Sequence, residues 1–99
     1  MIVVTGTIDI HPEDVWPATT IAAEMVRRTE MEEGCISYRF YVDINQLTRF
    51  RLYEEWQSEE ALAEHMETPH MAAFLSRIAD LRIIDRNVVK YEVTDPQPV

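Results

Sequence analysis

The sequence predicts one α+β domain whose elements follow in the order β-α-β-β-α-β. Four runs of the chain are rich in β-branched or aromatic residues, or alternate between apolar and polar side chains. Between them lie two stretches in which small or apolar residues recur every three or four positions, as on one face of a helix. A chain of 99 residues has the usual size of a single domain, so residues 1–99 are assigned to one unit.

The first part of this pattern is a strand followed by a helix. Residues 2–10 (IVVTGTIDI) are predicted to form the strand because most of them are β-branched. The helix is expected to begin near residues 11–14 (HPED), where acids suit the positive end of the helix dipole, and to run to about Glu32. Pro17 fits only in the first turn, where a missing N–H has no intrahelical partner. Gly34 is expected to end the helix.

The middle of the chain is predicted to form an antiparallel pair of strands. Residues 35–43 alternate, with Tyr38 and Phe40 on the same face. Residues 48–56 alternate again, and Glu54 lies on their apolar face. The connection between the two runs is short and polar, which is typical of a hairpin.

The last part is predicted to form helix and strand again. Ser58 is a good N-cap for one helix, and Thr68-Pro69 is expected to start a second, short helix. Residues 82–94 (RIIDRNVVKYEVT) are predicted to form a final long strand, followed by a proline-bearing tail.

Charge and composition exclude several classes of function. Nine basic against eighteen acidic residues give a net charge of −9, which repels the phosphates of nucleic acids and anionic lipids. No apolar run approaches the ~20 residues of a membrane span, and the start of the chain lacks the features of a secretory signal. Cys35 is the only cysteine. We therefore expect a reduced, cytoplasmic protein with no nucleic-acid or membrane partner.

Glu54 is the most informative anomaly in the sequence. It lies between Leu52 and Trp56 on an apolar strand face, where an unpaired carboxylate is expensive. His65, on the inner stripe of the following helix, is the expected partner. The pair could be a structural hydrogen bond, or Glu54 could orient His65 as a general acid or base, and the two roles are compatible.

Several aromatic and apolar side chains are predicted to point between the sheet and the helices. Such a set is consistent with an ordinary core and also with the lining of a small-molecule site. Tyr38 adds a hydroxyl that needs a partner when it is buried. The set comprises Tyr38, Phe40, Trp56, Met66 and Phe74.

Metal and cofactor motifs are absent from the sequence. His70 follows His65 by five residues, a step that does not place both on one helical face. Cys35 has no histidine beside it in sequence, so we interpret it as a packing residue. No glycine-rich phosphate loop is present. The expectation is therefore no metal and no nucleotide or flavin cofactor, with His70 as a structural or rim residue.

The other face of the two middle strands carries charges of both signs with tyrosines among them, including Arg39, Arg49, Arg51, Tyr53 and Glu55. In a monomer this would be a solvated face. A sheet covered by helices on one side leaves its other side open, and two copies can close such faces into a barrel. We therefore expect a homodimer through this face.

A set of motifs in this order and spacing resembles the antibiotic biosynthesis monooxygenase family, with the bacterial quinol monooxygenases as the branch most alike. No single motif is specific, but the set covers almost the whole chain. It consists of Glu33-Gly34-Cys35, Tyr38, Glu54-x-Trp56-x-Ser58, His65 and Thr68-Pro69-His70-Met71. The resemblance implies a ferredoxin-like protomer, a dimeric α/β barrel and one pocket per protomer.

The resemblance also implies an activity. The best-known members of this family oxygenate quinols and anthrones with O₂ and without flavin, heme or metal, because the deprotonated substrate supplies the electrons. By this resemblance His65, with Glu54 behind it, is the expected base and Tyr38 a polar donor. Phe40, Trp56, Met66 and Phe74 would contact the aromatic substrate. The alternative is a small-molecule isomerase or a ligand-binding dimer. Heme-degrading relatives have an asparagine and a histidine where this chain has Thr7 and Leu75, so heme degradation is disfavoured.

Overall fold

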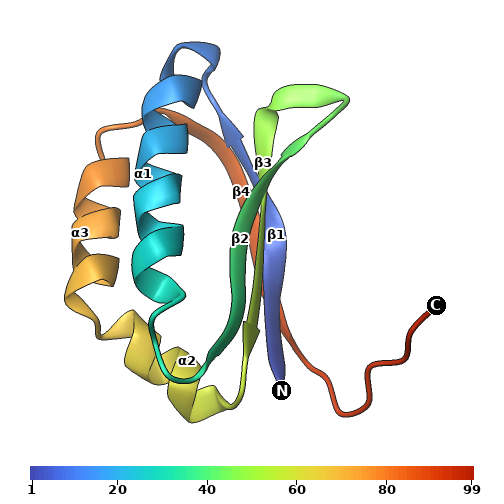
Figure 1. The fold of residues 1–99 in the computed structure, drawn as a ribbon. Helices are drawn as coiled ribbons and strands as arrows, with labels where there is room; N and C mark the ends of the chain where they lie inside the picture. The colour runs from blue at the N-terminus through green and yellow to red at the C-terminus, as the bar shows by residue number, and fades with distance from the viewer.

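The computed structural model describes all 99 residues and confirms the α+β prediction. Four antiparallel strands form one sheet in the order β2-β3-β1-β4, and the helices cover one of its faces (Figure 1). The order and pairing are those of a ferredoxin-like fold. The elements are β1 (Ile2–Ile10), a 3₁₀ turn η1 (Pro12–Asp14), α1 (Val15–Thr29), β2 (Cys35–Asp43), β3 (Gln46–Trp56), α2 (Glu59–Met66), α3 (Pro69–Ile78) and β4 (Ile83–Glu92).

The register of the sheet determines which side chains can meet. Glu54 of β3 lies opposite Tyr38 of β2 on one side and Val4 of β1 on the other. Val4 in turn lies opposite Lys90 of β4. Because directly paired residues share a face, this row crosses the whole sheet on the side that the helices cover.

Helix α1 begins as predicted but ends for another reason. Pro17 lies in its first turn, and Ala18, Ile21 and Met25 are buried on its inner face. The helix ends at Thr29, five residues before Gly34, and no glycine has a positive φ. The expected role of Gly34 as a helix terminator was therefore wrong. A Cβ on Gly34 would lie 2.3 Å from the Cβ of Ala61, so this glycine instead allows α2 to pack closely.

The break between α2 and α3 is built by local hydrogen bonds. Ser58 accepts a hydrogen bond from the Ala61 backbone N–H at 3.1 Å, which caps α2 as expected. Thr68 accepts one from the Met71 N–H at 3.2 Å and donates its hydroxyl hydrogen to the His65 carbonyl at 2.7 Å. Thr68 therefore both caps α3 and holds the end of α2, so the two short helices meet at a fixed turn.

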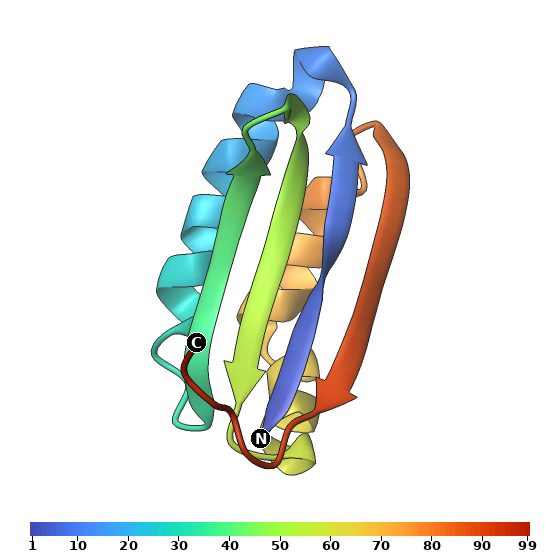
Figure 2. The ribbon, with the colours of Figure 1, turned by 90° about the vertical axis from the view of Figure 1, so that its right-hand side faces the viewer.

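The two faces of the sheet differ in covering. Trp56, Tyr38, Leu52, Ile2 and Met25 form the main buried cluster between sheet and helices. The opposite face is open, and the tail after β4 runs past the strand ends on that side (Figure 2). Most residues of β4 are exposed. The longest helix is neither long nor apolar enough to cross a membrane.

Candidate functional site

A cavity of about 390 Å³ lies between the sheet, α2, α3 and β4, and apolar side chains make up most of its wall. It is the space in which the sequence places the candidate site. Trp56, which was expected to contact a substrate, does not line it: its side chain is fully buried behind His65, with ring centroids 4.7 Å apart. The other six predicted site residues all line the cavity: Tyr38, Phe40, Glu54, His65, Met66 and Phe74.

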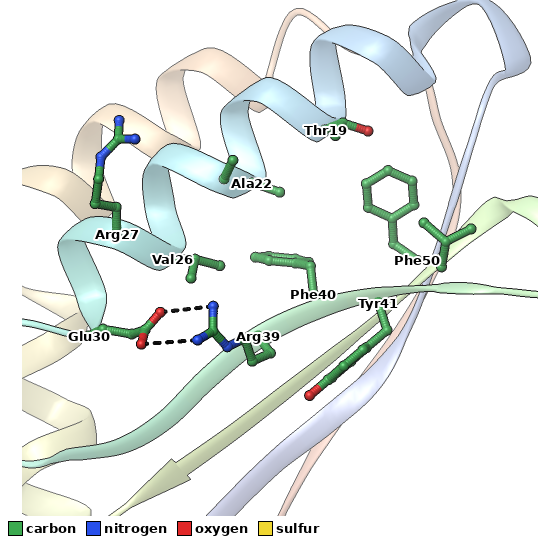
Figure 3. Close-up of a pocket in the computed structure, with 11 residues that line it drawn as sticks. Thr19, Ala22, Val26, Arg27, Glu30, Arg39, Phe40, Tyr41 and Phe50 are labelled. Carbon is green, nitrogen blue, oxygen red and sulfur yellow. Dashed lines mark hydrogen bonds and ion pairs between the residues drawn. The ribbon is translucent and has the colours of Figure 1, made fainter.

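A second hollow, of about 450 Å³, lies between α1 and β2 (Figure 3). Its charged groups are already satisfied. Arg39 reaches round the edge of the sheet to Glu30, with Nη1 and Oε1 3.1 Å apart, and Arg27 pairs with Glu24. Because the hollow contains no unpaired acid or base, we place the functional site in the cavity of about 390 Å³.

Glu54 is buried, as expected, but its partner is not His65. Its Oε1 accepts a hydrogen bond from the Trp56 indole N–H at 2.7 Å. Burial raises the pKa of the Glu54 carboxyl to about 7, against the lowering effect of that hydrogen bond. The negative charge of Glu32 raises the pKa further, and the positive charge of Arg86 lowers it. Glu54 can therefore exchange a proton near neutral pH.

The carboxylate that holds His65 is Glu32. His65 is only 2% exposed, and its Nδ1 lies 2.7 Å from Glu32 Oε2. Because an ionised carboxylate only accepts hydrogen bonds, this contact places the ring proton on Nδ1. The opposite nitrogen, Nε2, makes no hydrogen bond within the protein, and the ring that carries it lines the cavity.

His70 completes a cluster that the sequence spacing did not indicate. Its Nε2 also lies 2.7 Å from Glu32 Oε2. The expectation that His65 and His70 do not share a face used only their five-residue spacing along a helix and left out the predicted helix start at Thr68-Pro69. Because Thr68 ends one helix and starts the next, the two imidazoles converge on one carboxylate oxygen. Glu32 itself lies in the loop after α1, so the periodicity of a helix or strand could not predict which way its side chain points.

Tyr38 supplies a hydroxyl beside these groups. Its ring centroid is 5.6 Å from that of His65 and its residue is 2% exposed. Burial, with smaller effects from the negative charges of Glu54 and Glu32, raises the pKa of the phenol. The hydroxyl therefore stays protonated at neutral pH and can donate a hydrogen bond to a molecule in the cavity that Tyr38 lines.

Two basic residues of the cavity wall were missed. Arg86 and Lys90 of β4 both line the cavity, although neither was among the predicted site residues. Lys90 pairs with Glu59 at 3.0 Å, whereas the Arg86 guanidinium has no ion pair. The alternation of β4 contained the signal, because Arg86, Val88 and Lys90 are two residues apart and share a face.

Cys35 behaves as the sequence indicated. It is half-buried beside the main core, and burial raises the pKa of its thiol to about 11, so the thiol is protonated at neutral pH. A protonated thiol is a poor nucleophile and a poor metal ligand.

Comparison with known proteins identifies the family. A sequence model described as "Antibiotic biosynthesis monooxygenase" matches residues 1–77. A candidate antibiotic biosynthesis monooxygenase from Deinococcus radiodurans superposes with a TM-score of 0.93 at 21% identity, over 100% of this chain and 98% of the other. A conserved protein of unknown function from Bacteroides thetaiotaomicron, described as a possible oxidoreductase, gives 0.85 at 27% identity, over 93% and 96%.

An uncharacterized protein of Synechocystis sp., sll1783, is 29% identical over 96 residues, which are 97% of this chain. The match spans only 65% of the length of that protein. Fold and cavity thus define a small α+β protein with a largely apolar pocket and a few proton-exchanging groups. The chain belongs to the antibiotic biosynthesis monooxygenase family.

Proposed function

We propose that this protein is a cofactor-independent monooxygenase that uses O₂ to oxidise small electron-rich aromatics of the quinol or anthrone type. The observation that carries the proposal is that His65, Tyr38 and Glu54 all line one largely apolar cavity. A cavity of about 390 Å³ is large enough for a small polycyclic aromatic ring system.

The first step is removal of a proton from the substrate. His65 Nε2 is the proposed base because it makes no hydrogen bond within the protein and its ring lines the cavity. Glu32 fixes the ring through Nδ1 at 2.7 Å and stabilises the imidazolium that forms, so Glu32 is a positioning residue. Tyr38 donates its hydroxyl hydrogen to the oxyanion of the substrate. Glu54, with a pKa of about 7, accepts or returns the second proton.

The substrate supplies all the electrons of the reaction. The deprotonated aromatic passes one electron to O₂, and the resulting radical and superoxide combine to form a carbon–oxygen bond in the largely apolar cavity. The hydroperoxide then loses water. For an anthrone, the CH₂ group and O₂ become a C=O group and one water. For a quinol, the ring and O₂ become a hydroxyquinone and one water.

An oxygen-electrode assay over a panel of quinols and anthrones tests this function. The expected result is O₂ uptake above the protein-free autoxidation rate for at least one compound. His65→Gln should lower that rate by roughly 100-fold or more, as expected for loss of a general base. His11→Ala is the matched control, because His11 lies outside the cavity as the N-cap of η1. If no compound of the panel gives O₂ uptake above the autoxidation rate, the oxygenase proposal is refuted.

A second function has one observation in its favour. The unpaired Arg86 guanidinium on the cavity wall suits an anionic group, as a small-molecule isomerase or a binding protein for a phosphorylated or carboxylated ligand would need. Thermal stabilisation by such anions without O₂ uptake, abolished in Arg86→Gln, would favour this function.

We also propose that the protein works as a homodimer through the open face of its sheet. The polar groups on that face satisfy one another: Arg49 Nε lies 2.7 Å from Asp9 Oδ1, and the Tyr53 hydroxyl donates to Glu55 at 2.6 Å. Such internally paired charges can be covered by a second copy at a smaller desolvation cost than unpaired ones. Tyr41 and Tyr91 are exposed on the outer strands.

A further inference from the structure

Glu32, His65 and His70 come from three separate segments and meet at one point. One oxygen of Glu32 lies 2.7 Å from a nitrogen of each imidazole, and the three ligand atoms lie within 4.8 Å of one another. The side chain of His65 is 2% exposed, that of Glu32 15% and that of His70 21%. The cluster is therefore largely enclosed, unlike a group of acids on a solvated surface.

The charge of this cluster is uncompensated by any permanent cation. No arginine or lysine forms an ion pair with Glu32, whose only side-chain partners are the two imidazoles. A carboxylate removed from water needs a compensating charge or several strong donors. Two histidines and one carboxylate are the protein ligands of many Zn²⁺ sites, with water in the remaining positions.

We propose that Glu32, His65 and His70 bind one divalent transition-metal ion of borderline character, such as Zn²⁺. The ion replaces the two protons that the imidazoles share with Glu32, and it binds Nδ1 of His65 and Nε2 of His70. Ligand atoms around a tetrahedral Zn²⁺ lie ~3.4 Å apart when the bonds are ~2.1 Å long. The nitrogen–oxygen contacts of 2.7 Å must therefore widen, which a rotation of the loop residue Glu32 can provide.

Water can reach the remaining coordination positions from the side of His70. His70 lines a groove of about 450 Å³ between α1 and α3, separate from the cavity that His65 lines. The proposed ion therefore lies between the two hollows, next to His65 on the cavity side and His70 on the groove side.

Occupancy of this site has a consequence for His65, which rests on the proposed function. An imidazole bound to metal through Nδ1 carries its one remaining proton on Nε2, the nitrogen that we propose as the base. The metal-loaded protein then presents a hydrogen-bond donor where the metal-free protein presents a base. Zn²⁺ should therefore inhibit O₂ uptake rather than support it, and a chelator should restore it.

The test of the site needs neither substrate nor turnover. Calorimetric titration of the chelator-treated full chain with Zn²⁺ should show one site per chain with micromolar or tighter affinity. His70→Ala and Glu32→Gln should each weaken binding at least tenfold, and His11→Ala, the matched third histidine, should leave it unchanged. Co²⁺ in place of Zn²⁺ should give visible absorption bands of a four-coordinate ion, lost in the same two variants.

His70→Gln separates a metal site from a hydrogen-bond network. Its amide can still donate to Glu32, so the fold should be retained while Zn²⁺ binding falls at least tenfold. The proposal is overturned if the wild type shows no saturable binding below millimolar Zn²⁺, or if His11→Ala weakens binding as much as His70→Ala. It is also overturned if His70→Gln binds as tightly as the wild type. None of these outcomes depends on the oxygenase activity, which the O₂ assay judges separately.

Discussion

At the scale of single residues, the ionisation of Glu54 dominates the electrostatics of the cavity. Burial is the main reason that its pKa is raised from 4.5 to about 7. Because folding raises its pKa, the folded protein holds the carboxyl proton more tightly than the unfolded chain does. The stability gained in this way is fully present below the pKa of the unfolded chain, and it is lost as the pH rises through the pKa of the folded protein. The free energy of unfolding should therefore fall between about pH 4.5 and pH 7 because of this residue.

Replacing Glu54 with glutamine should remove that pH dependence. The amide oxygen of Gln can still accept the hydrogen bond from the Trp56 indole, but it carries no charge to desolvate. We expect Glu54→Gln to unfold at a higher urea concentration than the wild type at pH 8. Its free energy of unfolding should be larger by up to about 3 kcal/mol, because each pKa unit corresponds to ~1.4 kcal/mol. At pH 4.5 the two should be nearly equal. A stability difference that is the same at both pH values would contradict the raised pKa.

The residue scale is also where the sequence was least informative. Strand alternation correctly placed Glu54, Tyr38 and Phe40 toward the helices, because period-two geometry is a local property. It could not identify the partner of His65, since Glu32 lies in a loop and meets the ring only in the folded chain. The Trp56 indole was a foreseeable donor to Glu54, because residues two apart on a strand share a face.

At the scale of elements, the edge strand β4 depends on a single glycine. A Cβ on Gly6 would lie 2.0 Å from the Asn87 carbonyl oxygen and 2.5 Å from the Val88 Cα. Both are backbone atoms of β4, so the clash cannot be relieved by a side-chain rotation. Gly6 therefore allows β1 and β4 to approach closely, and β4 supplies one wall of the cavity.

Gly6→Ala should consequently push β4 away from β1. We expect a loss of stability on the order of 1–3 kcal/mol, as for other overpacked positions. Faster amide hydrogen exchange along residues 83–92 should accompany it. Asn87→Ala, a change on the same strand at an exposed position, serves as the control and should alter stability by less than about 0.5 kcal/mol. Equal stability of Gly6→Ala and the wild type would show that the strand tolerates the added carbon.

Element starts were predictable and one element end was not. The caps Ser58 and Thr68 act through hydrogen bonds within three residues, so their sequence signals were sufficient. The end of α1 was misassigned because the role of Gly34 is to leave room for Ala61, which lies 27 positions later in the chain. The basic side chains of β4 were missed although the alternation of that strand places Arg86 and Lys90 on the same face as Val88.

At the scale of the whole molecule, the uncovered face of the sheet predicts a second copy. Sedimentation equilibrium at micromolar concentration should give a mass near twice 11.6 kDa. Arg51→Glu should weaken the dimer by reversing a charge on that face, where Arg51 donates to Thr5. Arg77→Glu is a suitable control, because Arg77 lies on α3 on the helical side. A single species of 11.6 kDa for the wild type would contradict the dimer.

The most direct test of the oxygenase account is the fate of the oxygen atoms. Chelator-treated protein should be incubated with ¹⁸O₂ and whichever quinol or anthrone gives the fastest uptake, and the product should be analysed by mass spectrometry. The account predicts one ¹⁸O atom per product molecule and the other in water, with the labelled product strongly reduced in His65→Gln. A product whose new oxygen comes from water, or labelling that is the same in His65→Gln and in the protein-free control, would contradict it.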